Sequence, residues 1–171
     1  TLETVQVLRS SNITSIPNDA FCRCTLLRSI YIEDNVAITS IGTGAFYGCT
    51  SLETFVIPNS VTTIEGGAFA DCTSLEIVAI PNSVTKIRFR AFNNCTSLKS
   101  IIIPNSVTAI GIDAFYECKS LQLIEIPNSV ITIGDHPFND CIVLHQTTLH
   151  QRLINQARSL CCKSKKNQDF D

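Results

Sequence analysis

Residues 51–73 read SLETFVIPNSVTTIEGGAFADCT, and residues 74–96 repeat the pattern as SLEIVAIPNSVTKIRFRAFNNCT. The period of 23 residues continues in both directions. It is carried by phenylalanines at positions 21, 46, 69, 92, 115 and 138, and by cysteines at positions 24, 49, 72, 95, 118 and 141. The phrase Ile-Pro-Asn-Ser-Val starts at Ile57, Ile80, Ile103 and Ile126. A fixed period of this length predicts a solenoid, in which each unit covers the apolar face of the next.

The first half of a unit has the spacing of a short strand. In residues 51–73, Leu52, Phe55 and Ile57 are separated as L-x-x-φ-x-φ, where φ is apolar. Side chains of an extended chain alternate, so Phe55 and Ile57 point to the same side, which is the core. The Pro-Asn-Ser triplet at 58–60 then ends the strand, because proline lacks the amide hydrogen and asparagine and serine favour turns.

The second half of a unit returns the chain to the next strand. Val61 and Ile64 re-enter the core, and Gly66-Gly67 permit a sharp turn. The phenylalanines stack from unit to unit and form a structural spine of Phe21, Phe46, Phe69, Phe92, Phe115 and Phe138.

This pattern resembles the BspA-like leucine-rich repeats, a class found in bacterial surface proteins and in many protists. The matching residues are Leu52, Phe55, Ile57, Pro58, Val61, Ile64, Ala68, Phe69 and Cys72, with their equivalents over about residues 1–149. The first two units depart from it by two extra residues each, and the sixth has His136-Pro137. The resemblance implies a leucine-rich-repeat solenoid with a parallel β-sheet on the concave side and irregular or short helical turns on the convex side. It also implies surface adhesion or host contact.

The chain divides into three parts. Residues 1–144 hold six coils, at about 2–24, 27–49, 52–72, 75–95, 98–118 and 121–141. Residues 145–162 carry a helical apolar stripe and are predicted to form a C-terminal capping helix; an amphipathic membrane or partner helix is the alternative. Residues 163–171 form a polar tail. At the other end Leu2, Val5 and Val7 already match a strand without a cap, which indicates a missing upstream segment or an assembly contact at the first coil.

Composition excludes several classes of protein. The 171 residues are 44% hydrophobic and 16% charged, too apolar for a disordered chain. A net charge of −2 gives no reason to expect a nucleic-acid partner. No apolar run approaches the roughly 20 residues that cross a bilayer. The chain begins at Thr1 without a signal peptide, and both a surface and an intracellular location stay open.

No catalytic, metal or cofactor site is expected. The six cysteines of the repeat are interpreted as small buried hydrophobes with free thiols, and there is no Cys-x-x-Cys pair. Cys161-Cys162, followed by lysines, is a possible acylation site, and packing in the cap is the alternative. Two glycosylation triplets begin at Asn12 and Asn94. Lys86, Arg88 and Arg90 form a basic cluster that a solvated loop explains, and a docking site for an acidic partner is the alternative.

The strand positions between the core residues point outward and offer a candidate binding surface. The predicted partner-binding residues on this concave face are Tyr31, Val56, Ile77, Ala79, Ile102, Leu123 and Glu125. An apolar patch of this kind often marks an interaction site, although β-branched residues also suit strands. We therefore expect a non-enzymatic protein-interaction module. The alternatives are a structural subunit that makes contacts through its ends or convex side, an adhesion domain, or a regulatory domain of a larger protein.

Overall fold

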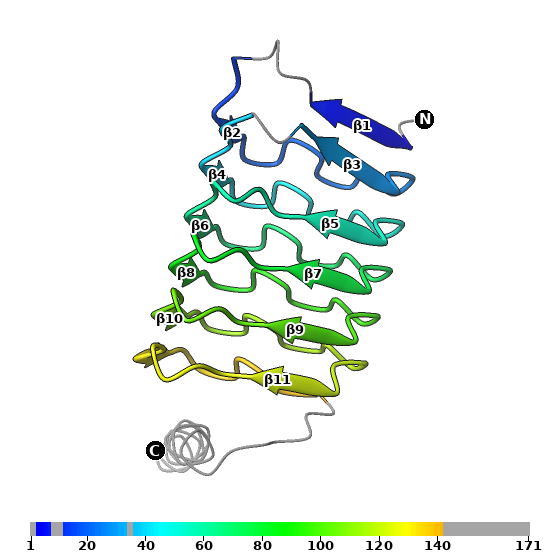
Figure 1. Cartoon of the computed structure of the whole chain (residues 1–171). Helices are drawn as coiled ribbons and strands as arrows, with labels where there is room; N and C mark the ends of the chain where they lie inside the picture. Colours follow the sequence, from blue (N-terminus) through cyan, green and yellow to red (C-terminus); the bar gives the residue numbers. More distant parts are fainter. Residues whose placement is uncertain (1–2, 8–11, 34–35, 142–171) are drawn as a thin grey trace, which may run out of the picture.

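The computed structural model describes residues 3–7, 12–33 and 36–141. They form a stack of coils in which a longer strand on one side alternates along the chain with a two-residue strand on the other (Figure 1). The longer strands are β1 (Thr4–Val7), β3 (Ser29–Ile32), β5 (Thr54–Val56), β7 (Ile77–Ala79), β9 (Ser100–Ile102) and β11 (Leu123–Glu125). The short strands are β2 (Ser15–Ile16), β4 (Ser40–Ile41), β6 (Thr63–Ile64), β8 (Lys86–Ile87), β10 (Ala109–Ile110) and β12 (Thr132–Ile133).

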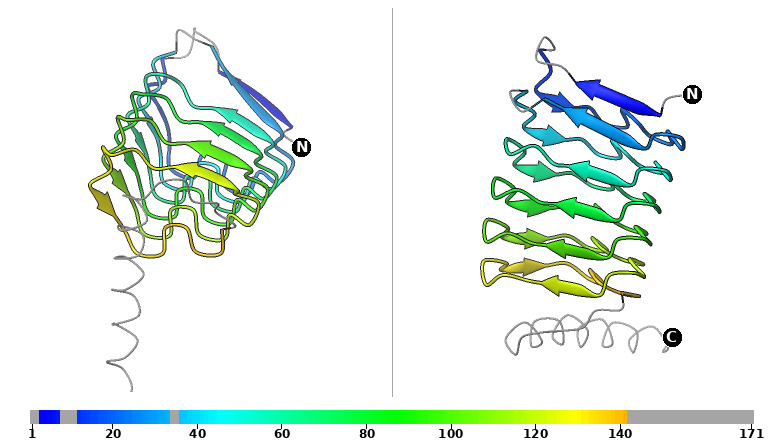
Figure 2. Two further views of the ribbon diagram at one scale, coloured as in Figure 1. Left: turned by 60° about the horizontal axis from the view of Figure 1, so that its bottom comes forward. Right: turned by 45° about the vertical axis from the view of Figure 1, so that its right-hand side comes forward.

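All strand pairs are parallel and join equivalent positions of neighbouring coils. We call the surface built by the longer strands the front face; it contains a two-stranded sheet, β1-β3, and a four-stranded sheet, β11-β9-β7-β5. The short strands form one six-stranded back sheet in the order β12-β10-β8-β6-β4-β2. The two views of Figure 2 show these two sides separated by the interior of the coils. Because the register follows the repeat, residues at equivalent positions of β5, β7 and β9 lie beside one another.

The core has the composition that the repeat predicts. In β5, Phe55 is buried and the flanking Thr54 and Val56 are exposed, which is the alternation of a strand with one covered face. Beyond the strand, the amide of Val61 donates to the carbonyl of Pro58 at 3.0 Å and closes the Pro-Asn-Ser turn. Val61 and Ile64 are fully buried on the return side, so both halves of the coil contribute to one core.

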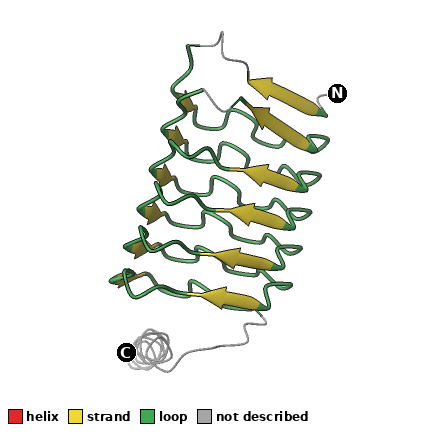
Figure 3. Ribbon diagram, in the orientation of Figure 1, coloured by secondary structure: helices red, strands yellow, loops and turns green. Residues whose placement is uncertain are grey.

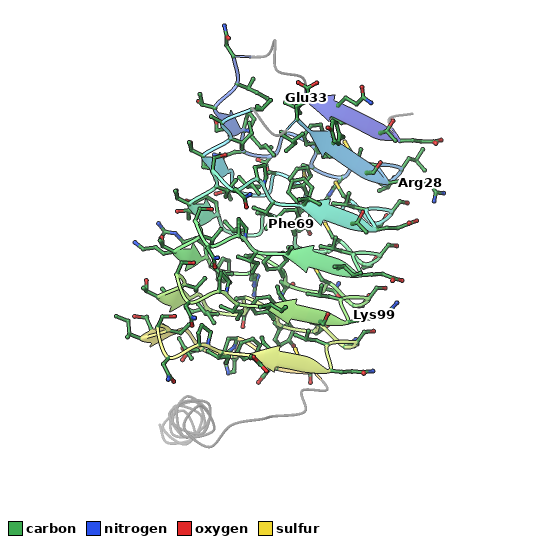
Figure 4. All side chains as sticks on the ribbon, in the orientation of Figure 1. Arg28, Glu33, Phe69 and Lys99 are labelled. Carbon is green, nitrogen blue, oxygen red and sulfur yellow. The ribbon has the colours of Figure 1, made fainter. Side chains whose placement is uncertain are left out.

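The phenylalanine spine runs through the whole stack. Successive rings from Phe21 to Phe138 lie parallel, with centroids 5.1–5.4 Å apart and interplanar angles of at most 14°. This separation lies within the range in which aromatic pairs attract one another. Phe69, labelled in Figure 4, is fully buried and also contacts Phe55 at a centroid distance of 5.1 Å. The structure therefore contains the expected stack of phenylalanine rings.

Two rows of side chains satisfy backbone carbonyls between coils. The thiols of Cys49, Cys72, Cys95, Cys118 and Cys141 each donate to the carbonyl of the phenylalanine in the preceding coil, at 3.0–3.1 Å. Three of the four serines of the Pro-Asn-Ser turns do the same on the return side: Ser60, Ser83 and Ser106 donate to carbonyls of the preceding coil at 2.6–2.7 Å, whereas the hydroxyl of Ser129 has no hydrogen-bond partner among the described residues. These bonds fix the stacking distance of the coils.

The helical turns expected on the convex side are wrong for the residues that the structure describes, since these contain no helix (Figure 3). Each coil instead passes through hydrogen-bonded turns with two residues at positive φ. In coil order these are Asp19 and Arg23, Gly44 and Gly48, Gly67 and Asp71, Arg90 and Asn94, Asp113 and Glu117, and His136 and Asp140. A residue in the left-handed region interrupts a right-handed helix, which explains why none forms. The predicted capping helix at 145–162 lies outside the described residues.

Candidate interaction surface

The front face carries large apolar side chains that are open to solvent. Val56 and Ile102 are 76% and 78% exposed, and Tyr31 and Ile77 are each 59% exposed. Ala79 is exposed as well. These exposed side chains do not contribute to the core, because Phe55, Val78 and Ile101 occupy it from the inner side of the same strands.

Sheet register brings these residues into one strip. Val56, Ala79 and Ile102 occupy equivalent positions in β5, β7 and β9 and lie directly beside one another. Tyr31 holds the same position in β3, the neighbouring strand in Figure 1, and Ile77 lies two residues from Ala79 on the same side of β7. We call Tyr31, Val56, Ile77, Ala79 and Ile102 the apolar strip.

The strip ends at an acidic residue. Glu125 of β11 pairs in register with Ile102 and is exposed, so the row changes from apolar to anionic at the last longer strand. The side chain of Leu123, the remaining residue of the predicted surface, is not among those that the structure describes. Six of the seven predicted positions are thus found exposed on one face.

A charged rim borders the strip where the strands begin. Arg28 lies 3.3 Å from Glu53, and Lys99 lies 2.6 Å from Glu76, each pair joining neighbouring coils. Arg28 and Lys99 project from the same edge of the front sheet in Figure 4. All four side chains are about half exposed or more, so these pairs add little stability but leave a polar border along the strip.

The cysteines, a metal site and a membrane-spanning helix have less support as functional features than the front face. The cysteines that the structure describes are free thiols, and those at 49, 72, 95 and 118 are buried. Burial raises the pKa of the Cys49 thiol to about 12 and that of Cys72 well above its usual value, so both remain protonated and poorly nucleophilic at neutral pH. Among the described residues no group of three metal-binding side chains comes together. No helix within the described ranges is long and apolar enough to cross a membrane.

The structure shows the surroundings of the basic cluster and of the two glycosylation triplets. Arg88 pairs with Glu65 at 3.7 Å and Arg90 with Asp113 at 3.2 Å, so the cluster is partly neutralised. Asn12 is exposed, whereas the amide of Asn94 is half-buried and donates to Asp71 at 2.9 Å. The proposed acylation site at Cys161-Cys162 lies outside the described residues.

Exposed apolar residues also lie outside the apolar strip: Ile13 and Leu26 are 42% and 49% exposed, and three more were not singled out from the sequence. Ile131 is 82% exposed at a position that holds threonine in the three preceding coils. Phe89 and Ile112 occupy equivalent positions on the convex side and are 49% and 45% exposed. The guanidinium of Arg90 lies 4.8 Å from the centre of the Phe89 ring and covers part of it. Ile131 departs from the threonine of the repeat, and that departure is the signal by which it could be found, whereas the position of Phe89 and Ile112 varies from coil to coil.

Comparison with known proteins agrees with the repeat. A family model described as "BspA type Leucine rich repeat region" matches six copies, over residues 2–115 and 39–168. No curated protein is significantly similar to the sequence.

Solved structures show the same fold. The crystal structure of a leucine-rich repeat protein of T. pallidum superimposes with a TM-score of 0.74 at 24% identity, covering 91% of this chain and 83% of that one. A leucine-rich repeat protein from Eubacterium ventriosum gives a TM-score of 0.58 at 24% identity. That match covers 87% of this chain but 45% of the Eubacterium protein, so this chain spans less than half of it.

Proposed function

Because the chain belongs to the BspA-type leucine-rich repeat family, we propose that it is a protein-interaction module whose partner binds the front face. Proteins of this family are generally of the interaction or surface-adhesion type. Adhesion at a cell surface would be one use of the same face. The proposal concerns where the partner binds and which residues contact it.

The observation that carries the proposal is the apolar strip. Val56 and Ile102 expose more than three quarters of their surface and lie in one row with exposed Tyr31 and Ala79. Strand propensity alone is a weak explanation, because the equivalent outward positions of other coils hold Gln6, Ser29 and Ser100. Contiguous apolar surface bordered by polar groups is the usual form of a binding site.

A structural role is the second candidate, and the first coil favours it. Val5, Val7, Phe21 and Cys24 pack against the core but remain partly exposed, unlike their counterparts in the middle of the stack. A subunit that covers this end would bury them. Contacts through the first coil would not involve the apolar strip, so the two candidates are separable.

Affinity capture from an extract of the source cells tests the proposal. The bait is the full chain, compared with the double variant Ile77→Glu, Ile102→Glu and with Ile131→Glu as a matched control. The control adds a carboxylate at a residue that is equally exposed but lies on the return side. A protein retained by the wild type and by Ile131→Glu, and lost with the folded double variant, supports the front face. Equal retention by all three baits contradicts it and favours the ends of the stack.

A further inference from the structure

One glycosylation triplet of this chain is open to a modifying enzyme and the other is closed. The sequence holds two Asn-x-Ser/Thr triplets, at residues 12–14 and 94–96. Transfer of a glycan needs two groups of the triplet at the surface: the asparagine amide, which is the nucleophile, and the hydroxyl two residues later, which the transferase recognises. We propose that Asn12 carries an N-linked glycan and that Asn94 does not.

The first triplet offers its asparagine to solvent. Asn12, Ile13 and Thr14 are all exposed and belong to neither a helix nor a strand. They lead directly into β2, at the back of the first coil (Figure 1). Within the part of the chain that the structure describes, the side-chain amide of Asn12 makes no hydrogen bond. A transferase can therefore reach this amide without moving any residue of the core.

The hydroxyl of Thr14 is open because this residue begins a row of threonines. The equivalent position in the next four coils is also threonine, at Thr39, Thr62, Thr85 and Thr108. The Oγ1 of each of these four donates to the carbonyl of the threonine before it, at 3.0–3.3 Å. Among the described residues Thr14 has no such threonine before it, and its Oγ1 makes no equivalent bond. The group that a transferase recognises is thus left exposed at the first coil.

The second triplet has both of its groups engaged. Asn94 has a φ of 55° in a hydrogen-bonded turn, and its side-chain amide donates to the carboxylate of Asp71 at 2.9 Å. The Oγ1 of Thr96 donates to the carbonyl of Thr73 at 3.3 Å. Cys95, between the two, is fully buried in the core. A transferase would have to pull this coil out of the stack to bind residues 94–96.

The reaction at Asn12 takes an oligosaccharide linked to a lipid through a pyrophosphate as its donor. The side-chain Nδ2 attacks C1 of the first sugar, and the bond from C1 to the pyrophosphate oxygen breaks with its electron pair on the leaving group. The amide gives one proton to a base of the transferase, so an N–C bond replaces an N–H bond and nothing is oxidised or reduced. Such donors belong to the secretory route, so the inference also predicts that the chain is exported.

The glycan and the proposed binding surface do not compete. Residues 12–14 precede a strand of the back sheet, whereas the apolar strip lies on the longer strands of the front face. The inference is therefore independent of the function proposed above, and either can fail without the other.

Peptide mapping of the protein isolated from its source cells tests the inference. The protein is treated with a peptide N-glycosidase, which converts a glycosylated asparagine into aspartate, and the peptides holding the two triplets are analysed by mass spectrometry. An untreated sample controls for spontaneous deamidation. The wild type is compared with Asn12→Gln, Thr14→Ala, Thr14→Ser and Asn94→Gln, all expressed in the same cells and checked for folding by their thermal transitions.

We expect the wild type, Thr14→Ser and Asn94→Gln to carry one glycan at residue 12, and Asn12→Gln and Thr14→Ala to carry none. The serine variant keeps the hydroxyl that the transferase recognises, so its modification separates recognition from a general effect of substitution. An unmodified Asn12 in the wild type overturns the inference. A glycan on Asn94 overturns it as well, because the bonds to Asp71 and Thr73 would then not protect the second triplet.

Discussion

The sulfur of Cys95 lies 3.1 Å from the carbonyl oxygen of Phe69 in the preceding coil, and the same contact recurs in each neighbouring pair of coils. We infer that cysteine recurs here because the position has room only for a small side chain and lies beside a carbonyl oxygen that accepts a hydrogen bond. The thiol fills a fully buried site and bonds a carbonyl that otherwise accepts only from the amide of Cys72 at 3.3 Å.

Replacing this thiol tests its contribution. Cys95→Ala removes the sulfur and its bond and is expected to lower the free energy of unfolding by about 1–2 kcal/mol. Cys95→Ser keeps a donor and should lose less. Urea denaturation of both variants provides the measurement. If the serine variant is no more stable than the alanine variant, the bond to Phe69 contributes nothing.

The thiols also make the fold sensitive to alkali. Burial raises the pKa of Cys49 from 9.0 to about 12, so above pH 9 the unfolded chain releases a proton that the folded chain retains. Fewer bound protons in the unfolded state mean that stability falls as pH rises. We expect the stability of the wild type to decline from about pH 9 toward pH 12, and Cys49→Ala to show a shallower decline. An identical pH profile for the two proteins would contradict the assignment.

The phenylalanine spine should be most sensitive in its middle. Phe69 stacks on a ring at both faces and is fully buried, so Phe69→Ala is expected to cost about 3–5 kcal/mol. Phe21 stacks on Phe46 at 5.3 Å and is partly exposed, and its replacement by alanine should cost distinctly less. Thermal denaturation compares the two variants, and equal losses would show that the spine does not act through burial.

Two glycines of the turns serve different purposes and respond differently to alanine. Gly67 has a φ of 62°, and a new Cβ would meet only the Cβ of Ala70 at an ordinary contact distance of 4.0 Å, so Gly67→Ala should cost about 1 kcal/mol through backbone strain. A Cβ on Gly111 would run into the backbone of Arg88 and Phe89 in the preceding coil. Gly111→Ala should therefore separate the coils locally and cost several times more. Chemical denaturation measures both, and a milder effect at Gly111 would contradict this close approach.

Much of this architecture is predictable because one residue of the repeat constrains its neighbours. The spacing of Leu52, Phe55 and Ile57 directs these three side chains into the core. Val56 must then point outward, and it is exposed in the structure. The period likewise predicts that the phenylalanines stack. Candidate surface residues follow from the same alternation, since a strand with one covered face must present the other.

The back sheet and the left-handed turns could not be predicted from the sequence, for physical reasons. The back sheet consists of two-residue strands such as Thr63–Ile64, too short to show any alternation. Nine of the twelve left-handed turn positions hold Gly, Asp, Asn or His, the types that adopt a positive φ most readily, but Arg23, Arg90 and Glu117 adopt it as well. Residue type therefore marks these positions only in part, and stacking on the neighbouring coils decides the others. The family resemblance implies short helical turns, but Gly67 and Asp71, which flank Ala68-Phe69 at positive φ, prevent a helix there.

Titration of an isolated partner measures directly whether that partner binds the front face. The partner recovered by capture is titrated calorimetrically into the wild-type chain, the Ile77→Glu, Ile102→Glu variant and the Ile131→Glu control, each verified as folded by its thermal transition. We expect the double variant to weaken binding by roughly tenfold or more and Ile131→Glu to leave it unchanged, because only the former places carboxylates in the apolar strip. Equal affinity of the partner for all three proteins would contradict a front-face binding site.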